Sequence, residues 1–391
     1  MKKSLISEVF PSLWLIVLMF VGCTSGKNND GGIIEINDSN VQTVESIDLT
    51  EMFDTDCSYM ALETHEGCLI GDIEDMQFHD DKLFILSSVS GDNEVLVFDA
   101  KGHFINKIGV RGRGPEEYVA ISAFGVNPYG KYVVLVDPLK EKIHKYDYSG
   151  KYLESLKPKG NCAFLQRIRF ISEDRMRCVY QINNSSDVSI AECNEDFGNY
   201  MVLSKTDFIF HGGYIFSESP ITQNGSHLIT PLSNIIYQYN SNRLDSVYCV
   251  TLNNNYQPNQ KYDKGSDYSK LVVDAIKKSY SPLSIHENNA LLMLQQFPYM
   301  ILWDKKTNKG YKIKNATNTA RYDYLPINST SKVCDFNDGF IVVYSATDLH
   351  EMNEYYKREN IKPSKELNDL FKNVGFEDNP AILFWKIKRK E

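Results

Sequence analysis

The sequence has few of the short motifs that mark a catalytic or metal site. Its eight cysteines include no CxxC pair, its eight histidines include no HxH or HExxH spacing, and GxSxG does not occur. These absences argue against structural zinc, helical metalloprotease sites and serine-hydrolase chemistry. The sequence therefore nominates no catalytic residue, no metal ligand and no cofactor.

Dense positive charge and long apolar runs are also missing. The 391 residues carry a formal charge of -9 with no Lys/Arg block, so a nucleic acid is not an expected partner. The apolar run Phe10 to Val21 is too short to span a bilayer. Because it follows Lys2 and Lys3 at the start of the chain, it has the layout of a signal peptide.

Phe20-Val21-Gly22-Cys23 resembles a bacterial lipobox, in which the cysteine becomes the lipidated first residue of the mature protein. The resemblance implies a lipoprotein signal peptide over residues 1–22 and a lipid (palmitate-type) anchor on Cys23. Residues 23–42 are then expected to form a flexible tether, because their first part is rich in Gly, Asn, Asp and Ser. An ordinary cleaved signal with a chance cysteine is the alternative.

Two strand-turn-strand units recur 48 residues apart. The first has Phe98-Asp99 before a turn that ends at Gly102, and the second has Tyr146-Asp147 before a turn that ends at Gly150. A period near 50 built from short strands is typical of a propeller blade. The aspartates are expected to cap their turns.

The same rhythm continues and predicts an all-β fold, a six-bladed β-propeller of four-stranded antiparallel blades over residues 43–391. Helical spacing of apolar residues predicts two small insertions, at about 266–279 and 348–374. The chain ends soon after a strong strand, Ala381 to Ile387. We expect a segment between Val44 and Glu63 to supply the neighbouring rim strand, because sheets avoid bare edges.

Seven cysteines remain once Cys23 is set aside, and three of them, Cys178, Cys249 and Cys334, lie in strand-like apolar runs. Buried free thiols that pack as small hydrophobic groups are the simplest interpretation. One disulfide in an exported chain is an open alternative, but the sequence assigns no pair.

Two segments match a known family. Phe98 to Phe104 (FDAKGHF) and Gly109 to Tyr118 (GVRGRGPEEY) resemble the bacterial six-bladed β-propeller lipoproteins, which are related to NHL-repeat propellers. The opening YMALET and the EDNP before the last strand resemble the same family. The resemblance implies a propeller in the cell envelope, as an outer-membrane lipoprotein facing the periplasm or the surface. It implies no settled activity.

One dense polar cluster lies in this motif and is the candidate ligand-binding site. Its arginines could bind an anionic sugar or a partner carboxylate through bidentate contacts. The alternative makes the cluster a strut between blades, with the tyrosine packed and a glutamate pairing an arginine. The cluster consists of Arg111, Arg113, Glu116, Glu117 and Tyr118.

We therefore expect a monomeric, non-enzymatic binding or scaffolding module for a glycan or an envelope protein, which meets the membrane only through its lipid. The alternative is a channel-centred lyase or hydrolase that uses a metal assembled from distant blades. Histidines clustered with carboxylates on the axis would favour the enzyme, whereas an aromatic shelf containing Trp303 and Trp385 would favour a glycan. The insertion 348–374 is either a partner-docking element, removable without loss of the fold, or a packed helix pair.

Overall fold

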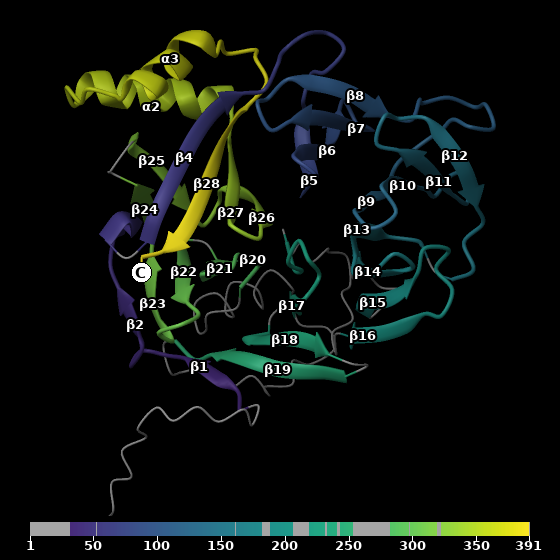
Figure 1. Cartoon of the computed structure of the whole chain (residues 1–391), viewed down its shortest axis with the longest axis horizontal. Coiled ribbons are helices and arrows are strands. Elements are labelled where there is room, and N and C mark those ends of the chain that lie inside the picture. Colours follow the sequence, from purple (N-terminus) through teal and green to yellow (C-terminus); the bar gives the residue numbers. More distant parts are fainter. Residues whose placement is uncertain are drawn as a thin grey trace, which may run out of the picture. The chain divides into compact units, whose positions relative to one another are not determined.

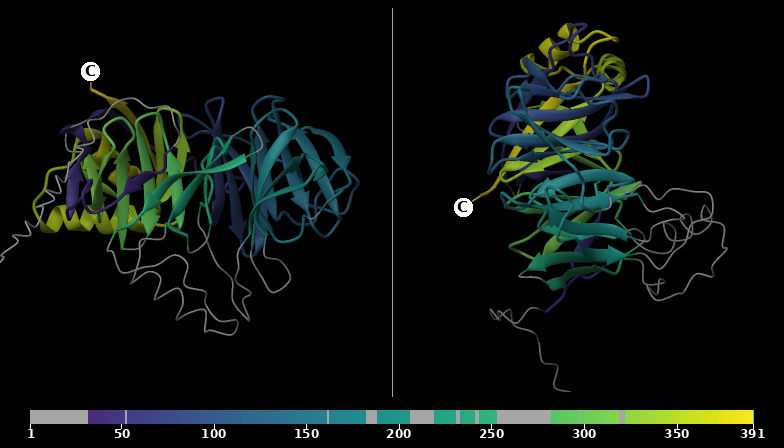
Figure 2. Two further views of the ribbon diagram at one scale, coloured as in Figure 1. Left: turned by 90° about the horizontal axis from the view of Figure 1, so that it is seen from below. Right: turned by 90° about the vertical axis from the view of Figure 1, so that its right-hand side faces the viewer.

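Strands dominate the computed structural model and form six blades around a common axis (Figure 1). The two further views in Figure 2 show the neighbouring sheets standing side by side. The predicted six-bladed all-β propeller is confirmed. The structure describes residues 32–51, 53–160, 162–181, 188–205, 219–230, 233–240, 243–252, 282–296, 298–318 and 322–390.

The first three blades are consecutive four-stranded meanders, and the first strand of each lies nearest the axis. Short turns make such local antiparallel pairing the simplest arrangement. Blade one contains β5 (Asp72–His79), β6 (Lys82–Val89), β7 (Asp92–Asp99) and β8 (Phe104–Ile108). Blade two contains β9 (Ala123–Asn127), β10 (Tyr132–Asp137), β11 (Lys142–Asp147) and β12 (Tyr152–Leu156), and blade three contains β13 (Leu165–Phe170), β14 (Arg175–Tyr180), β15 (Val188–Asn194) and β16 (Met201–Lys205).

The last three blades each take an outer strand from the beginning of the chain. Blade four has β17 (His227–Ile229), β18 (Ile235–Asn240) and β19 (Arg243–Val250) with β1 (Ile34–Ile36). Blade five has β20 (Ser284–Glu287), β21 (Leu291–Gln296), β22 (Tyr299–Asp304) and β23 (Lys309–Ile313) with β2 (Val41–Thr43). Blade six has β26 (Lys332–Phe336), β27 (Gly339–Tyr344) and β28 (Ala381–Arg389) with β4 (Phe53–Ala61), and a small sheet beside it holds β3 (Ser46–Asp48), β24 (Asn315–Asn318) and β25 (Tyr322–Asn328).

The predicted closure of the ring is confirmed and extends further than expected. Strand β4 pairs antiparallel with β28 over nine residue pairs, from Ala61 opposite Ala381 to Phe53 opposite Arg389. In addition, β1 and β2 pair in parallel with the outer strands of blades four and five. The sheets thus begin at Ile34, inside the stretch that the sequence suggested was a tether, and the N-terminal residues join three successive blades.

The repeated turns have the capping chemistry that their sequences predict. The Asp99 carboxylate accepts from the amides of Lys101 and His103, at 2.8 and 2.9 Å. The Asp147 carboxylate accepts from Ser149 and Lys151 in the same way, at 2.8 and 3.0 Å. These bonds hold each hairpin in register without help from distant residues, which explains why the repeat is visible in the sequence.

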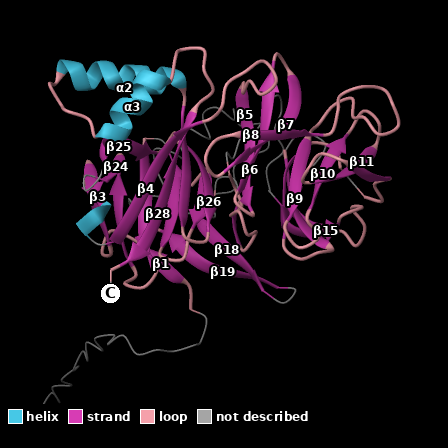
Figure 3. Cartoon of the chain, turned by 45° about the horizontal axis from the view of Figure 1, so that its top comes forward, coloured by secondary structure: helices cyan, strands magenta, loops and turns pink. Residues whose placement is uncertain are grey.

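Two helices cover the outer end of blade six: α2 (Ala346–Arg358) and α3 (Lys365–Asn373) (Figure 3). Ser345 and Asp348 form a capping box at the start of α2. The Ser345 backbone N–H donates to the Asp348 carboxylate at 2.9 Å, and the Asp348 backbone N–H donates to the Ser345 hydroxyl at 3.1 Å. Tyr356 and Leu367 are fully buried in a core cluster that also contains residues of β4 and β28. Deleting residues 348–374 would expose part of this core, which favours the packed helix pair, and removal of the insertion without loss of the fold stays a prediction.

The two tryptophans that might have formed an aromatic shelf lie in the interior instead. Trp303 on β22 is fully buried and Trp385 on β28 is 1% exposed. Neither ring can stack on a sugar without unfolding its sheet. The predicted helix at 266–279, the signal peptide and Cys23 lie outside the described residues. No helix among the described residues is long and apolar enough to cross a membrane.

Candidate functional site

The innermost strands of the six blades converge on a cavity of about 340 Å³. This volume is at the lower end of the range of about 300–1,000 Å³ found for small-molecule sites. Hydroxyl, amide and charged side chains dominate its lining, and no Phe, Tyr or Trp is present among the described lining residues. The polar lining residues are Glu74, Asp75, Asn93, Ser122, Gln166, Arg167, Arg169, Ser219, Gln223, Ser284, His286, Gln295, Ser331, Lys332, Cys334 and Asp335. We call this the axial cavity.

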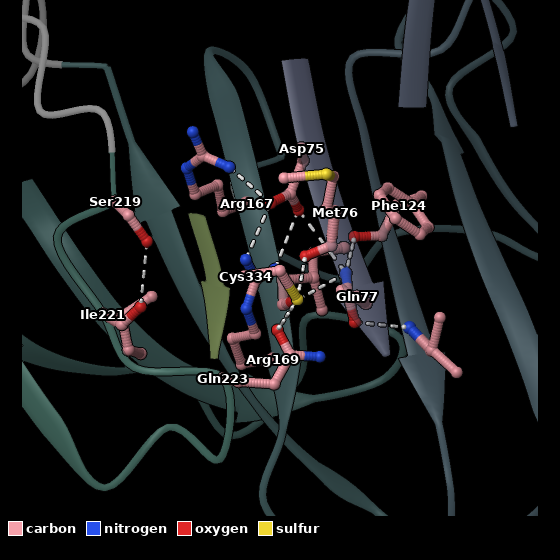
Figure 4. Close-up of polar contacts among 12 residues, drawn as sticks. Asp75, Met76, Gln77, Phe124, Arg167, Arg169, Ser219, Ile221, Gln223 and Cys334 are labelled. Atoms are coloured by element: carbon pink, nitrogen blue, oxygen red, sulfur yellow. Dashed lines mark hydrogen bonds and ion pairs between the residues drawn. The ribbon is translucent and has the colours of Figure 1, made fainter. Parts of the chain in front are cut away.

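A buried ionic group forms one wall of the axial cavity. Arg169 on β13 makes a bidentate contact with Asp75 on β5, at 2.8 and 2.7 Å, and Arg167 contacts the same carboxylate. Figure 4 shows both guanidinium groups directed at Asp75. Bidentate guanidinium–carboxylate geometry is stronger and more directional than a neutral hydrogen bond. The group therefore fixes blade one against blade three across the axis.

Irregular pairing in β5 and β13 orients the charged side chains of Asp75, Arg167 and Arg169. The β5–β6 register shifts between Ile73 and Asp75, and the β13–β14 register shifts between Leu165 and Arg167. A bulge re-aims the side chains beside it, because it inserts one extra residue into the alternation of the strand. The extra residues are Glu74 and Gln166, and both line the axial cavity.

The surroundings of Asp75 favour its charged form. Burial alone would raise the pKa of this carboxyl, but Arg169 and Arg167 outweigh burial and hold the pKa below its usual range. Burial alone would lower the pKa of Arg169, but Asp75 raises it. The Nε–H of Arg169 is buried without a hydrogen-bond partner in the structure. The unpaired Nε–H adds to the cost of burying the ionic group.

Gln77 continues the polar wall toward blades two and three. Its Nε2 donates to the carbonyl oxygens of Phe124 and Ile168, at 3.2 Å each, and its Oε1 accepts from the Val126 amide at 3.0 Å. All of these partners are buried, so the amide side chain satisfies backbone groups that water cannot reach.

The opposite wall is organised by Asp335 on β26. Its carboxylate accepts from the amides of Gln223 and Glu287, at 3.0 and 3.3 Å, and lies 3.3 Å from His286 Nδ1. The second ring nitrogen of His286 lies 3.1 Å from Gln295 Oε1. Both nitrogens of His286 are engaged by protein groups. This wall holds the histidine in place but leaves it no ring nitrogen for a substrate.

Cys334 lies between the two walls with a buried thiol. Burial raises its pKa well above the usual thiol value, the nearby Asp335 adds to this effect, and the thiolate that a nucleophile needs is suppressed. No group of three or more His, Cys, Asp or Glu suited to a metal ion occurs among the residues that the structure describes. The described part of the chain therefore offers no site for the metal of the alternative enzyme hypothesis.

A second hollow of about 710 Å³ adjoins the axial cavity and leads outward to α2. The two hollows share Ile73, Ser331 and Lys332 in their linings, so they lie side by side. We call the outer one the side groove. Phe376 lies at its edge with a ring that is 62% exposed.

The side groove is acidic. Its carboxylates outnumber its single amine, that of Lys332, and all but one belong to exposed residues. The carboxylates are those of Asp72, Asp348, Glu351 and Asp378.

The cluster proposed from the sequence lies in the link between blades one and two, and none of its residues lines either hollow. Tyr118 is buried, and burial raises its pKa to about 12. Arg111 pairs with Asp92 rather than with a glutamate. Arg113 and Glu116 are exposed at the surface. The Glu117 carboxylate accepts from the Gly114 amide at 2.7 Å within the link. Binding of a ligand by these five residues stays a prediction.

The sequence contained only a weak signal for the residues that were missed. Asp75, Arg167 and Arg169 lie in strand segments, DIEDMQFH and LQRIRF, that mix polar and apolar residues. A buried charge needs a partner, but the sequence does not show that these three residues are buried or that they pair with one another.

Comparison with known proteins places the chain among families without an assigned activity. Residues 32–386 match the model of a family described as a domain of unknown function, DUF4934. The chain belongs to this family. No curated protein matches it.

Two solved structures are similar to the chain, and the first has a similar fold. One is a protein of Bacteroides fragilis, provisionally described as exported, with 16% identity and a TM-score of 0.62 over 92% of this chain and 100% of that chain. Another, from Bacteroides vulgatus and of the DUF4221 family, has 12% identity and a TM-score of 0.48 over 87% of this chain and 99% of that chain. At these identities the likeness concerns the fold alone.

Proposed function

We propose that this member of the family is a non-enzymatic binding module, and that its axial cavity and side groove together hold an extended segment of a partner protein. The observation that carries the proposal is that the two hollows lie side by side and share Ile73, Ser331 and Lys332 in their linings. A polar cavity beside a groove suits a chain-like ligand that lies in the groove with one end at the cavity.

The lining favours a peptide over a glycan. Serine hydroxyls and glutamine amides in the axial cavity can donate to and accept from peptide groups. Sugar rings are commonly held on the faces of Phe, Tyr or Trp, yet the described axial lining contains none of these residues, and Trp303 and Trp385 are interior residues. The exposed ring of Phe376 in the side groove suits an apolar or cationic side chain.

The negative charge of the side groove favours a partner segment that is positively charged. Asp72 and Glu351 are exposed carboxylates there, whereas Lys332 is the single amine of the described lining and donates to the Ile73 carbonyl at 2.7 Å. A segment with lysine or arginine side chains would gain from this excess of negative charge, and an acidic one would be repelled.

Binding is tested with two synthetic peptides of equal length, one with lysines and one with glutamates at the charged positions. Fluorescence anisotropy is expected to show tighter binding of the lysine peptide, weakened by salt and by Glu351→Gln. Glu66→Gln changes an exposed acid outside both hollows and is the matched control. Binding that is unchanged by Glu351→Gln, or binding to a glycan array with none to peptides, would overturn the proposal.

We further propose that the module is a monomer tethered to the outer membrane by a lipid on Cys23. The lipobox-like residues Phe20 to Cys23 support this, as does the provisional description of the B. fragilis neighbour as exported. Membrane fractions from cells that express the full chain are expected to contain the wild type but not Cys23→Ala. An alanine variant that still fractionates with membranes and carries acyl chains would contradict the anchor.

A further inference from the structure

Two buried cysteines in blade three face each other across neighbouring strands. Cys178 lies on β14 and Cys193 on β15, and their Sγ atoms are 3.6 Å apart. In the ladder Cys178 is opposite Ala191 and Cys193 is opposite Met176. The two cysteines are therefore a diagonal pair on the same face of the sheet, because side chains two positions apart on a strand share a face.

A covalent link would require the two strands to shift as well as the side chains to rotate. A disulfide bond is about 2.05 Å long, so the sulfurs would have to approach by roughly 1.5 Å. Both side chains are fully buried in the core between blades two and three. Diagonal neighbours in a sheet have Cα atoms about 7–8 Å apart, at the limit for a disulfide, so a shift of β14 against β15 must accompany any change of χ1.

We propose that Cys178 and Cys193 form an internal disulfide that links β14 to β15 when the chain folds under oxidising conditions. The thiolate of one cysteine attacks the disulfide of a thiol–disulfide exchange reagent and releases one thiol. The other cysteine then attacks the protein sulfur of the mixed disulfide and releases the second thiol. Two electrons and two protons pass from the cysteines to the reagent, whose disulfide is reduced to two thiols.

Burial determines when the bond can form. Neither sulfur is exposed to solvent in the folded state, and burial raises the pKa of Cys178, with the contact to Cys193 adding to the effect. Exchange requires a thiolate and access to the reagent. The reduced native protein should therefore resist oxidation, whereas the unfolded or folding chain should react.

The test is refolding of the denatured, reduced full chain with oxidised and reduced glutathione, followed by alkylation in denaturant and peptide mapping. The expected product lacks alkylation at Cys178 and Cys193 and is lighter by about 2 Da per disulfide before alkylation. The same glutathione mixture added to folded, reduced protein is expected to leave both residues alkylatable.

Variants separate this pair from the other cysteines. Cys193→Ala should leave Cys178 as a free thiol or a glutathione adduct and abolish the linked peptide, whereas Cys162→Ala should retain it. Cys162 is a half-buried cysteine packed against the same core, which makes it a matched control. Full alkylation of both residues in refolded wild-type protein would overturn the proposal, as would a disulfide between either residue and another cysteine.

Discussion

Two parts of the molecule join residues that lie far apart in the sequence, but they use different forces. The seam of blade six pairs β4 with β28 and buries large apolar side chains such as Trp385 and Phe53. The axial wall joins Asp75 to Arg167 and Arg169, which lie 92 and 94 residues away, through charge and hydrogen bonds. The seam therefore depends on side-chain volume, whereas the axial wall depends on ionisation.

The different forces suit the different roles of the two regions. Apolar burial is non-directional and tolerates an irregular partner, so it suits the closing of a ring by a segment from the far end of the chain. Charged groups in a low-dielectric interior are costly unless each is matched in position. The axial wall bears that cost beside a cavity whose polar groups can also meet a ligand.

The largest expected effect is at the seam. Trp385→Ala removes a side chain that is 1% exposed and should reduce the free energy of unfolding by about 3–5 kcal/mol. Chemical denaturation measures the loss. Phe376→Ala, at a ring that is 62% exposed, is the control and should cost less than about 0.5 kcal/mol. Equal losses in the two variants would show that β4 and β28 do not close the fold.

The next effect is at the axial wall. Asp75→Asn removes the charge that Arg167 and Arg169 share and leaves two guanidinium groups without their carboxylate, at a cost of about 3 kcal/mol in unfolding free energy. Asp92→Asn breaks the half-exposed pair with Arg111 and should cost less than about 1 kcal/mol. Similar denaturation midpoints for the two variants would contradict a buried ionic wall.

The pH dependence of stability should come from buried carboxylates of the inner strands rather than from the seam. Burial alone would raise the pKa of Glu287, but His227 at 2.7 Å and Lys305 at 2.6 Å lower it to about 2. A depressed folded-state pKa gives stability that is present above the unfolded value of 4.5 and is lost as pH falls toward 2.

The contribution of Glu287 at neutral pH is on the order of 2–3 kcal/mol. Glu287→Gln should therefore flatten the dependence of unfolding free energy on pH between 4.5 and 2, while Trp385→Ala should shift the whole curve downward without changing its slope. An unchanged slope in Glu287→Gln would show that the carboxylate is not stabilised in the folded state.

The smallest effect concerns the backbone contact between blade one and the strand of the seam. Gly102 and Gly91 both have φ near +87°, but a Cβ on Gly102 would lie 2.4 Å from the Ala61 carbonyl oxygen, whereas Gly91 has nothing within 4 Å. Gly91→Ala should lower the free energy of unfolding by about 1 kcal/mol, because of the backbone conformation alone. Gly102→Ala should lower it by about 1–2 kcal/mol more, because of the added contact. Equal losses of stability in the two alanine variants, measured by thermal or chemical unfolding, would show that the contact between Gly102 and Ala61 does not stabilise the seam.

The hairpins of blades one and two could be predicted because their determinants are local. Asp99 and Asp147 cap turns within four residues of themselves, so the pattern of the chain carries the information. The closure by β4 could also be inferred, since the last strand needed a neighbour. The pairing of β1 and β2 with blades four and five could not, because three-residue strands lack a distinctive period.

The candidate site was harder to predict from the sequence than the fold. The cluster around Arg111 is dense in the sequence yet lies in a link between blades and lines neither hollow, whereas the axial residues are scattered over six blades. Nothing in the order of residues says that the strand holding Asp75 faces the strand holding Arg169. Only the ring geometry brings their side chains within 2.8 Å.

The sequence by itself determined the repeating sheet unit, the place of the helical insertion at 348–374 and the need for a strand from the beginning of the chain. These depend on short-range periodicity, turn capping and the cost of an unpaired edge, all of which act over a few residues. Tertiary structure alone decided which side chains line the axis, which charges meet there and which cysteines lie in contact. Those depend on distances between residues far apart in the chain, which ring closure sets.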